Sequence, residues 1–586
     1  MMDQMKKKQI IILFVIIASI FGCQQKAENP FVKGPYLQKL GQTEMTVVWE
    51  NDTTYSGEVF YGKGENLNLT AETNGVSKIQ KVVLKNLEAE TEYSYQVEVN
   101  GYRSSKYSFR TAVKKGSPFS FAAYGDNKGG PFNHKKIADL ILSYRPLFVV
   151  NNGDMVERGT VYKQWDKLFF TPAHEMMAEI PLVPAIGNHE RNAEYYYNYF
   201  CLPDNKAWHS FDINGAHFVI VNTEPKYLFD SNEQINWLKN DLEQNKATWT
   251  FVFEHVPPFT SGGNYYANDR VAVKNLLHPI YEKYNVDMVI AGHDHHYERS
   301  KPIGSRKSKH AVTYIVGGNG GTPMRYIGKQ RDFSFKVSRT FGFSLIDIDG
   351  SNLRFREISI NNKIIDEFTL DKNDPKSVNE YLKNKVYFED IKDPSKKVRK
   401  LYRSVGRRAY KKKKYAEAIP PLKEAFKLDP TCGEAAGLLA ACYAKLGDEK
   451  NAEKYANKAI SITPLLPDSY EAMAEIYKKK KEYKKAIEWY KKQYKVQPDS
   501  PGALEDIANI YVNQKKYDQA IDTYKKAVKV LPNDWELHFN LAKLYEKLNM
   551  KKEALVEYQK TVQWFYDENK NDEYITSMEK IKELSK

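Results

Sequence analysis

The chain has 586 residues, of which 42% are hydrophobic and 13% aromatic, so it is long enough for several domains and apolar enough for packed cores. This composition excludes a globally disordered chain. The formal net charge of +14 at pH 7 comes mostly from lysines on the predicted C-terminal helices, and no nucleic-acid-binding motif accompanies it. The charge therefore suits anionic substrates or surfaces and predicts no nucleic-acid module.

The first 22 residues have the pattern of an export signal. Lys6 to Lys8 provide a positive start, and Ile10 to Ile20 form an apolar run. This run is too short to serve comfortably as a permanent membrane span, which predicts a cleaved signal peptide over residues 1–22.

The end of this signal resembles the lipobox of bacterial lipoproteins. The resemblance implies that Cys23 becomes the lipidated first residue, and that two or more acyl chains tether the protein to a membrane. Gln24 after the cysteine is associated with the outer membrane of Gram-negative bacteria, which implies an exported lipoprotein of the cell envelope. The alternative is an ordinary secretory signal in which Cys23 has no role. Cys432 and Cys442 are too far apart in one predicted helix to form a disulfide.

Residues 30–112 alternate apolar and polar side chains in short runs separated by turns, which predicts a β-sandwich. Leu84, Leu87 and Tyr93 are placed as in the tyrosine corner of fibronectin type III-like sandwiches, which this region resembles. None of these residues suggests chemistry, so we expect a supporting domain.

Residues 117–370 change to apolar strands that end in Gly, Asp, Asn or His and alternate with amphipathic segments. This pattern predicts an α/β domain in which the loops after the strands carry the functional residues. Residues 371–398 are charged and contain two prolines, which predicts a partly helical linker.

Residues 399–586 contain five copies of a 34-residue repeat. Small residues, a tyrosine and a proline recur in a fixed register, and this is the tetratricopeptide (TPR) pattern of paired helices. We expect an all-α solenoid that ends in a capping helix and binds a protein partner, with a purely structural appendage as the alternative. The recurring alanines and prolines are Ala418, Ala452, Ala486, Ala520 and Ala554, and Pro430, Pro464, Pro498 and Pro532.

Five segments of the central region share one form, an apolar strand followed by a side chain that can bind a metal ion. In the strand from Val289, an apolar run ends at Gly292, and two histidines follow, two residues apart. A lone His-x-His is more often a surface loop, so the other segments decide the interpretation. Those segments end at Asp126, Asp154, Asn188 to Glu190, and His255.

Carboxylates and imidazoles at strand ends can hold two metal ions. Two such ions, about 3.5–4 Å apart, repel each other and need a shared carboxylate between them. The pair binds the oxygens of a phosphate ester and lowers the pKa of a bound water. Together and in this order, the five segments predict a dinuclear centre that acts on phosphate esters.

The order Gly-Asp, Gly-Asp, Gly-Asn-His-Glu, His and Gly-His-x-His resembles the motif set of calcineurin-like metallophosphoesterases, and in particular that of purple acid phosphatases. The likeness covers about residues 30–370 and includes Gly34 to Gln38 and Gly317 to Gly321. It implies a central α/β metallophosphoesterase sandwich and two metal ions, which could be Fe, Zn or Mn.

The resemblance also implies a role for each matched residue. Asp154 would bridge the two ions, and His189 would stand beside the leaving-group oxygen as proton donor or phosphate clamp. The implied ligands are Asp126, Asp154 and His295 for the first ion, and Asp154, Asn188, His255 and His293 for the second.

Two positions depart from the family pattern. Glu157 stands where purple acid phosphatases have a tyrosine ligand, so we expect no purple colour. Lys128 stands where other metallophosphoesterases have a histidine, which leaves the first ion with three matched ligands, to which Glu157 or Asn127 could add a fourth. Lys128 could bind the substrate phosphate as a point charge or be a solvated lysine, and His296 is a second candidate for phosphate binding.

We therefore expect a membrane-anchored phosphatase that hydrolyses phosphomonoesters and binds a protein partner through its TPR repeats. A phosphodiesterase or nucleotidase on the same metal site is one alternative, because the pocket loops decide between these substrates. An inactive scaffold on a phosphatase fold is another. The sequence argues against the scaffold, because competent side chains fill all six ligand positions and the position of His189.

Overall fold

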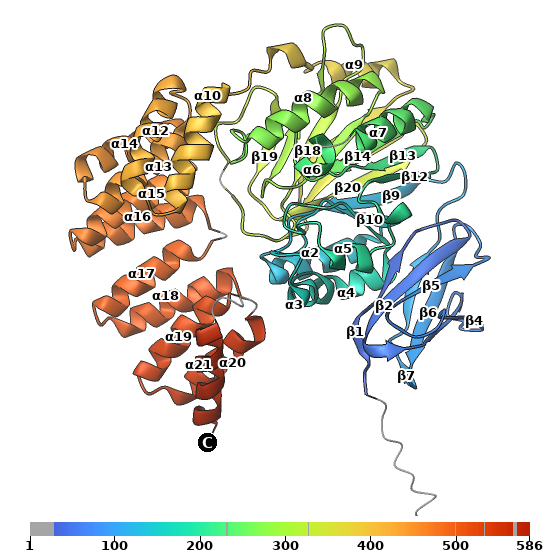
Figure 1. Cartoon of the computed structure of the whole chain (residues 1–586), viewed down its shortest axis with the longest axis horizontal. Helices are drawn as coiled ribbons and strands as arrows, with labels where there is room; N and C mark the ends of the chain where they lie inside the picture. Colours follow the sequence, from blue (N-terminus) through green and yellow to red (C-terminus); the bar gives the residue numbers. More distant parts are fainter. Residues whose placement is uncertain are drawn as a thin grey trace, which may run out of the picture.

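The computed structural model describes residues 28–229, 232–325, 327–498, 500–532, 534–565 and 571–585. The predicted signal peptide, residues 1–22, and the predicted lipidation site Cys23 lie outside these residues. A strand-rich part, a central part with two sheets and a helical array follow one another along the chain (Figure 1). Within the described ranges, every helix is either too short or too polar to cross a membrane.

The N-terminal part is a sandwich of two sheets that share one core. Trp49 and Tyr95, one from each sheet, are fully buried in it. One sheet has the order β1 (Phe31–Gln38), β2 (Glu44–Tyr55) and β5 (Ser77–Lys85). The other has the order β4 (Leu69–Glu72), β3 (Glu58–Lys63), β6 (Glu92–Val99) and β7 (Tyr102–Arg103), with β8 (Tyr107–Arg110) also paired to β6.

The predicted tyrosine contact of this sandwich is present. The hydroxyl oxygen of Tyr93 accepts a hydrogen bond from the backbone N–H of Glu88 at 2.9 Å, so the side chain ties the β5–β6 connection to the sheet. The β-sandwich prediction is confirmed, whereas its fibronectin type III-like character stays a prediction.

The central part consists of two sheets packed face to face with helices outside them, as the α/β pattern predicted. The first sheet has the order β11 (Leu182–Pro184), β10 (Phe148–Asn151), β9 (Phe119–Tyr124), β20 (Gly342–Asp349), β21 (Asn352–Ser359) and β22 (Ile364–Asp371). The second has the order β12 (His209–Ile213), β13 (Ala216–Ile220), β14 (Trp249–Glu254), β15 (Met288–Ala291), β18 (Thr313–Gly317), β16 (Tyr297–Ser300) and β19 (Ser334–Ser338).

Aromatic side chains fill the space between these sheets. Phe121 of β9 meets Phe218 of β13 and Phe251 of β14 with ring centroids 5.1 and 5.0 Å apart. Edge contacts of this kind add to the free energy gained from burying the rings. This layer fixes the two sheets relative to each other and therefore fixes the loops at their ends.

Helices cover the outer faces of both sheets. On the first sheet they are α2 (Pro131–Tyr144), α3 (Tyr162–Gln164), the π-helical segment η1 (Trp165–Phe170), α4 (Thr171–Glu179) and α5 (Glu194–Tyr199). On or near the second sheet are α6 (Pro225–Phe229), α7 (Glu233–Gln244) and α8 (Asn268–Lys283), and a short turn of helix, η2 (Pro203–Asn205), precedes β12.

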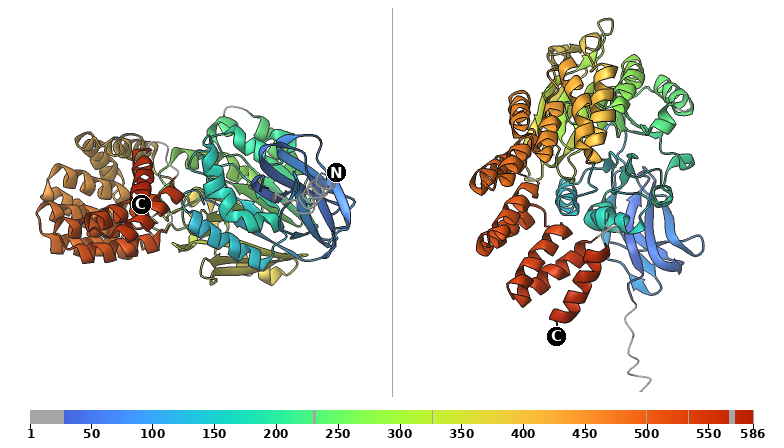
Figure 2. Two further views of the ribbon diagram at one scale, coloured as in Figure 1. Left: turned by 90° about the horizontal axis from the view of Figure 1, so that it is seen from below. Right: turned by 60° about the vertical axis from the view of Figure 1, so that its left-hand side comes forward.

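The sandwich packs against the first sheet and its helices (Figure 2). The Tyr36 hydroxyl donates to the backbone oxygen of Tyr199 at 2.7 Å, and the Tyr95 hydroxyl donates to that of Ala178 at 2.7 Å. Buried hydrogen bonds between the two parts satisfy polar groups that would otherwise be costly at an apolar contact. The sandwich therefore supports the sheet that carries three of the predicted ligand loops.

The segment predicted as a linker, residues 371–398, is partly helical and pairs with the central part. It contains α9 (Pro375–Leu382), β23 (Val386–Tyr387) and the short helix η3 (Phe388–Asp390), and β23 pairs in parallel with β17 (Ile303–Gly304). Arg270 of α8 donates to the Asp393 carboxylate at 2.8 Å. These contacts hold the segment against the central part.

The helical array consists of five consecutive helix pairs and a last helix. The first pair is α10 (Lys396–Arg399), η4 (Lys400–Arg407) and α11 (Arg408–Lys411), followed by α12 (Tyr415–Leu428). The others are α13 (Gly433–Leu446) with α14 (Glu449–Ile462), α15 (Pro467–Lys479) with α16 (Tyr483–Val496), α17 (Gly502–Asn513) with α18 (Tyr517–Val530), and α19 (Trp535–Lys547) with α20 (Lys551–Trp564), before α21 (Asn571–Leu584).

The recurring small residues lie where neighbouring helices touch. All five recurring alanines are fully buried, and a Cβ atom on Gly406 would come within 2.6 Å of the Leu422 side chain. Each recurring proline follows the second helix of a pair by two residues, for example Pro430 after Leu428. The repeat register of the sequence is therefore the register of the helix packing.

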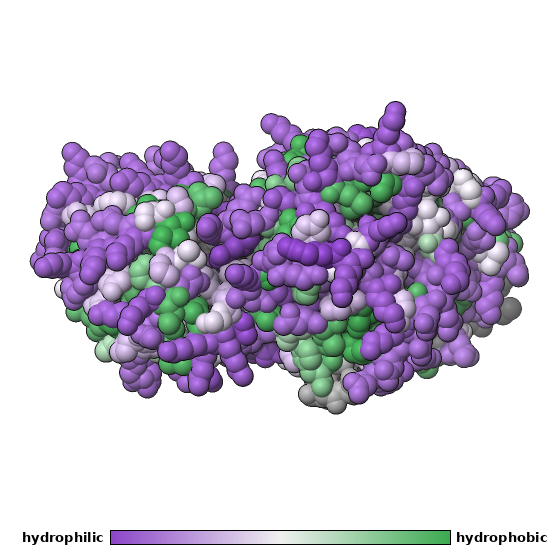
Figure 3. All heavy atoms as spheres, turned by 90° about the horizontal axis from the view of Figure 1, so that it is seen from above, coloured by the Kyte–Doolittle hydropathy of each residue, from purple (hydrophilic) through white to green (hydrophobic). Residues whose placement is uncertain are grey.

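The array docks on the central part at several points along its length. Tyr266 donates to Asp429 at 3.0 Å, Gln497 donates to the Met324 backbone oxygen at 3.2 Å, and Lys167 donates to the Phe565 backbone oxygen at 3.0 Å. The apolar core around α8 continues without a break into α12 and α13. The face in Figure 3 is predominantly hydrophilic over both the array and the central part.

Candidate metal centre

The predicted ligand residues come from five parallel strands whose carboxyl ends lie at one edge of the central sheets. In the first sheet β9 and β11 both run parallel to β10, and in the second sheet β14 runs parallel to β15. Loops after parallel strands of the same sheet meet at the same edge, which is where α/β proteins bind their ligands. Because the two sheets pack face to face, their loops meet in one place.

Three of the predicted ligands have strained backbones. Asp126, Asp154 and His293 have φ angles of 57°, 58° and 69°, and residues other than glycine rarely adopt this backbone region. A Cβ atom on Gly187 would lie 2.4 Å from Asp154 Oδ1, and one on Gly292 would lie 2.5 Å from Asp126 Oδ2. The glycines therefore allow the close approach of the loops, and the strain concentrates at the predicted site.

Four ligand atoms converge on one point. Asn188 Oδ1 lies 3.1 Å from His255 Nε2 and 2.9 Å from His293 Nδ1, and the two imidazole nitrogens are 3.2 Å apart. Asp154 Oδ1 lies 3.3 Å from His255 Nε2. A tetrahedral shell with bonds of about 2.1 Å separates its ligand atoms by about 3.4 Å. The four residues that the sequence assigned to the second ion therefore have the spacing of a metal shell.

Backbone oxygens set the tautomer of two histidines. His255 Nδ1 lies 2.9 Å from the Asn152 backbone oxygen, and His295 Nδ1 lies 3.1 Å from that of Pro323. A carbonyl oxygen only accepts hydrogen bonds, so Nδ1 carries the hydrogen in both rings. When these rings are neutral, Nε2 is the nitrogen without hydrogen and faces the site, which is the arrangement common around protein-bound metals.

The residues assigned to the first ion lie beside this shell. Asp126 Oδ1 and His295 Nε2 are 3.4 Å apart, are buried, and have no hydrogen-bond partner in the described residues. Asp126 Oδ2 accepts the backbone N–H of His293 at 2.6 Å, which links the two ligand loops. The ammonium of Lys128 also enters this space, with ion pairs to Asp154 Oδ2 and, at 3.5 Å, to Asp126 Oδ1.

His189 stands at the solvent side of the centre. Its side chain is 28% exposed, whereas those of Asp126, Asp154 and His255 are at most 1% exposed. Its Nε2 lies 4.0 Å from Asp154 Oδ2, and its Nδ1 lies 2.8 Å from the Glu157 backbone oxygen. The ring is therefore oriented by the backbone and presents Nε2 towards the centre.

Comparisons with known proteins agree with this geometry. The family profile described as calcineurin-like phosphoesterase matches residues 119–297, which span from the first predicted ligand strand to the residue after His296. The central part of this chain is a calcineurin-like phosphoesterase domain. Proteins of this family depend on a dinuclear metal centre, and the cluster of Asp154, Asn188, His255 and His293 has the donor spacing that one metal ion requires.

Several curated proteins and a solved structure resemble about half of this chain. An uncharacterized protein of Mycobacterium tuberculosis is 26% identical over 47% of this chain, and the chain spans 63% of that protein's length. Purple acid phosphatase 21 of Arabidopsis thaliana is 26% identical over 55% of this chain and 83% of its own length, and mouse acid phosphatase type 7 is 26% identical over 59% and 92%. The structure of a purple acid phosphatase from yellow lupin seeds has a similar fold, with a TM-score of 0.50, 21% identity, and coverage of 59% of this chain and 75% of that one.

The helical array also matches known families. Two profiles described as TPR repeat and tetratricopeptide repeat match residues 508–549 and 409–476. A third, described as anaphase-promoting complex, cyclosome, subunit 3, matches residues 447–527. The C-terminal part therefore consists of TPR repeats.

Charges inside the phosphoesterase domain interact strongly. Burial lowers the pKa of His255, but the adjacent Asp154 carboxylate outweighs it and raises that pKa to about 9. Burial and the neighbouring His255 lower the pKa of His293 to about 4. The two rings are nearly perpendicular with centroids 5.0 Å apart, and a positive charge on one disfavours a charge on the other, so the Asp154 carboxylate favours the charge on His255. A bound cation in the same place requires both rings to be neutral.

Glu190 holds two ligand loops together, and the sequence had given it no role. Its carboxylate is fully buried and accepts the backbone N–H groups of Asp154 at 2.9 Å, Met155 at 2.7 Å and Gly187 at 2.7 Å. It therefore fixes the loop of Asp154 against the loop of Asn188. The signal was present in the Gly-Asn-His-Glu run, but hydrogen bonds to a backbone distant in sequence are not visible there.

Asp294 fixes the His293 and His295 loop in a similar way. It is fully buried, and it accepts hydrogen bonds from the Thr260 hydroxyl and the Asn264 amide, both at 2.7 Å. Because both of its oxygens are engaged by these neutral groups, Asp294 positions the loop and leaves the ligand shell to the histidines. Its place between two histidines was the only sequence signal.

The remaining candidates lie near the centre in different settings. His296 is fully buried, with Nε2 3.2 Å from Glu298 Oε2, so its ring lies in the interior, and its predicted contact with phosphate stays a prediction. Asn127 is also fully buried, and its amide lies between His134, Met155 and Asn151. Glu157 contacts His189 Nδ1 at 3.4 Å.

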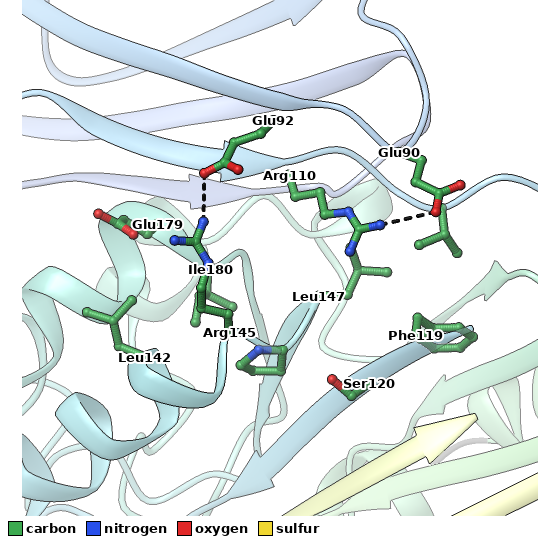
Figure 4. A pocket seen from close by; sticks show the side chains of 12 residues that line it. Glu90, Glu92, Arg110, Phe119, Ser120, Leu142, Arg145, Leu147, Glu179 and Ile180 are labelled. Carbon is green, nitrogen blue, oxygen red and sulfur yellow. Dashed lines mark hydrogen bonds and ion pairs between the residues drawn. The ribbon is translucent and has the colours of Figure 1, made fainter. Parts of the chain in front are cut away.

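A separate cavity of about 450 Å³ lies between the sandwich and the phosphoesterase domain (Figure 4). Glu92 and Arg145 face each other across it with an ion pair of 2.8 Å, and Glu90 and Arg110 form a second pair. None of the predicted metal ligands lines it. The cavity is an interdomain gap lined by paired charges, and it has no part in the metal centre.

Proposed function

We propose that this protein is a metal-dependent phosphatase that hydrolyses phosphomonoesters. The observation that carries the proposal is the shell formed by Asp154, Asn188, His255 and His293, whose donor atoms lie 2.9–3.3 Å from one another along the measured pairs. Carboxylate, amide oxygen and imidazole donors suit Zn, Mn or Fe, so the residues fit the implied cofactor. The bound metal would supply Lewis acidity and an activated water.

The protein's own groups prepare the reaction. Asn188 and Asp154 are held by the Glu190 network, so the donor atoms are in place before substrate binds. The partly exposed His189 can donate a proton from Nε2 to the leaving oxygen, because its Nδ1 is tied to the Glu157 backbone oxygen at 2.8 Å. Burial lowers the pKa of His189, but the hydrogen bond with Glu157 and the charge of Asp154 outweigh it and raise the pKa overall. The ring therefore keeps its proton more readily than a free imidazole.

The proposal is tested with Asp154→Asn. We expect this variant to lose bound metal and to hydrolyse 4-nitrophenyl phosphate at least ~10³-fold more slowly, because the residue contributes to both binding and orientation of the cofactor. Asp139→Asn is the matched control, since Asp139 is an exposed residue of α2 that pairs with Lys135. Undiminished turnover in the Asp154 variant would refute the proposal. Faster hydrolysis of bis(4-nitrophenyl) phosphate than of the monoester would identify a phosphodiesterase instead.

We further propose that the TPR repeats bind a protein partner. The support is the repeat family itself, whose stacked helix pairs present an extended surface for partners. The array also touches the phosphoesterase domain near its ligand loops, so a partner on the array would be held beside the metal centre. Crosslinking in cells of the organism that produces the protein tests this proposal, with the full chain compared to a chain that ends at residue 395. If both chains crosslink to the same set of proteins, the TPR repeats do not bind the partner.

Finally, we propose that the protein is an exported lipoprotein anchored in the outer membrane through Cys23. The support is the N-terminal sequence, with its basic start, its apolar run and a cysteine at the expected cleavage point. Cys23→Ser should move the protein from the detergent-rich phase to the aqueous phase and abolish labelling by a clickable palmitate analogue. Cys201→Ser is the control, and unchanged partitioning of the Cys23 variant would show that no lipid is attached there.

A further inference from the structure

Lys128 is a buried lysine in the middle of the metal centre. It follows β9 by four residues, its side chain is 3% exposed, and its ammonium pairs with Asp154 Oδ2 and with Asp126 Oδ1. A lysine is almost never buried to this extent unless opposite charges surround it. The two carboxylates provide that surrounding, and they are also the two oxygen donors assigned to the first ion.

The two predicted metal sites differ in how well their donors converge. Asp154, His255 and His293 offer donor atoms that all lie within 4.8 Å of one another, and this is the only such group of three or more acidic, histidine or cysteine residues in the described part of the chain. The donor atoms of Asp126, Asp154 and His295 are more widely spread, although Asp126 and His295 both lie beside Asp154. The space between them contains the Lys128 ammonium.

We propose that Lys128 takes the place of one of the two cations, so that this phosphoesterase domain binds a single metal ion. That ion is held by Asp154, Asn188, His255 and His293. The ammonium of Lys128 neutralises Asp126 and the second oxygen of Asp154 as a fixed point charge. This inference rests on the proposed function and specifies which groups of the site carry it out.

Charge and space favour this arrangement over two ions beside a lysine. One divalent ion and one ammonium bring three positive charges to the carboxylates of Asp126 and Asp154, and a second divalent ion would bring five. An ion bound to both carboxylates would also stand in contact with the ammonium, because Nζ already touches Asp154 Oδ2 and lies 3.5 Å from Asp126 Oδ1. Like charges at contact distance in a buried site repel strongly.

The arrangement gives Lys128 a task in the reaction. An ammonium has three N–H donors and no acceptor. Two of them face Asp126 and Asp154, which leaves the third for an oxygen of the substrate phosphate. The phosphate would then lie between the metal ion and the lysine, and Lys128 would supply the charge that a second ion supplies in a dinuclear centre.

Metal stoichiometry tests the inference independently of activity. The full chain is saturated with Mn²⁺, freed of excess ion by gel filtration, and its metal content per chain is measured by mass spectrometry. We expect one equivalent for the native protein and two for both Lys128→His, which adds an imidazole, and Lys128→Ala, which empties the space. Lys135→Ala is the control and should keep one equivalent, because Lys135 is an exposed residue of α2 that pairs with Asp139.

Electron paramagnetic resonance adds a second readout. Two Mn²⁺ ions about 3.5–4 Å apart are magnetically coupled, whereas a single ion gives an uncoupled signal. We expect the uncoupled signal in the native protein and the coupled one in Lys128→His. Circular dichroism identifies a variant that fails to fold. If one Lys128 variant is unfolded, the metal content of the other tests the inference.

The outcomes separate the inference from the proposed function. Two equivalents with a coupled signal in the native protein would overturn the inference and leave the phosphatase proposal standing. One equivalent in the native protein and in both folded variants would also overturn it, because Lys128 would not be what excludes a second ion. A native protein that binds no metal and hydrolyses no phosphate ester would refute the proposed function itself.

Discussion

Replacing Glu190 by glutamine should loosen the metal centre without removing any ligand. The Glu190 carboxylate accepts three short backbone N–H bonds, from Asp154, Met155 and Gly187. Burial and the charge of Asp154 raise the pKa of Glu190, whereas the hydrogen bonds from Asp154 and Gly187 favour its ionised form. Glutamine has nearly the same shape but replaces one acceptor oxygen by an NH₂ group, which can only donate.

The loss of stability expected for Glu190→Gln follows from the number of backbone N–H groups that lose their acceptor. One oxygen serves Asp154 and Gly187, and the other serves Met155. Whichever way the glutamine amide turns, at least one buried N–H faces another donor, and each such group costs about 1–3 kcal/mol. With the loss of a charge-assisted bond, we expect about 2–4 kcal/mol of destabilisation. Metal affinity should fall about 10–100-fold, as for other groups that orient ligands.

Two measurements check this prediction. The dissociation constant for Mn²⁺ is obtained by titrating the metal-free protein against a fluorescent chelator, and unfolding is followed by differential scanning fluorimetry. Glu194→Gln is the matched control, because Glu194 lies four residues further on and is exposed. If Glu190→Gln and Glu194→Gln bind Mn²⁺ within twofold of each other and unfold at the same temperature, the role assigned to Glu190 is wrong.

His189→Ala should lower kcat about 10²–10⁴-fold for an alkyl phosphate and much less for 4-nitrophenyl phosphate, whose leaving group needs no proton; equal losses would contradict a proton donor. Burial raises the pKa of Glu357 from 4.5 to about 8. Between these pH values the folded protein keeps a proton that the unfolded chain loses, so the free energy of unfolding falls as the pH rises. Glu357→Gln removes this titrating group. Urea unfolding at several pH values between 4.5 and 8 should therefore show a free energy of unfolding that falls less steeply than in the native protein, by about 1.4 kcal/mol per pH unit. Arg403 donates to Asn264 at 2.8 Å, so Arg403→Ala should cost about 1 kcal/mol at the Asp294 loop and lower kcat/KM about fivefold, whereas the exposed Arg408→Ala should leave it unchanged.

The sequence located most of the candidate site because the site is built from strand ends. An apolar run followed by Gly-Asp or Gly-His marks a buried strand and the loop after it, and parallel strands bring such loops to one edge. The strand pattern therefore placed Asp154, Asn188, His255 and His293 on loops at one edge, and the family resemblance implied that they share one ion. Their role as metal ligands remains a prediction that the measured spacing supports.

Side-chain directions were beyond the reach of sequence patterns. Lys128 was compatible with either a solvated lysine or a phosphate ligand, and the structure shows a third situation, a buried ammonium between Asp126 and Asp154. Glu190 and Asp294 likewise act through partners 30 or more residues away. Such contacts depend on how two loops pack, and periodicity in one segment carries no information about the other.

By itself, the sequence determined the order of the parts, the strands that end in ligand-type residues, and the register of the TPR repeats, because each depends on spacing within a short stretch of chain. Only the tertiary structure decided which charged side chains lie in contact and where the TPR repeats pack against the phosphoesterase domain. Tyr266 reaches Asp429, and Arg403 reaches Asn264, across a contact between parts more than 130 residues apart. Packing of distant surfaces selects such pairs through burial and hydrogen bonding, and these are properties of the folded chain rather than of any local pattern.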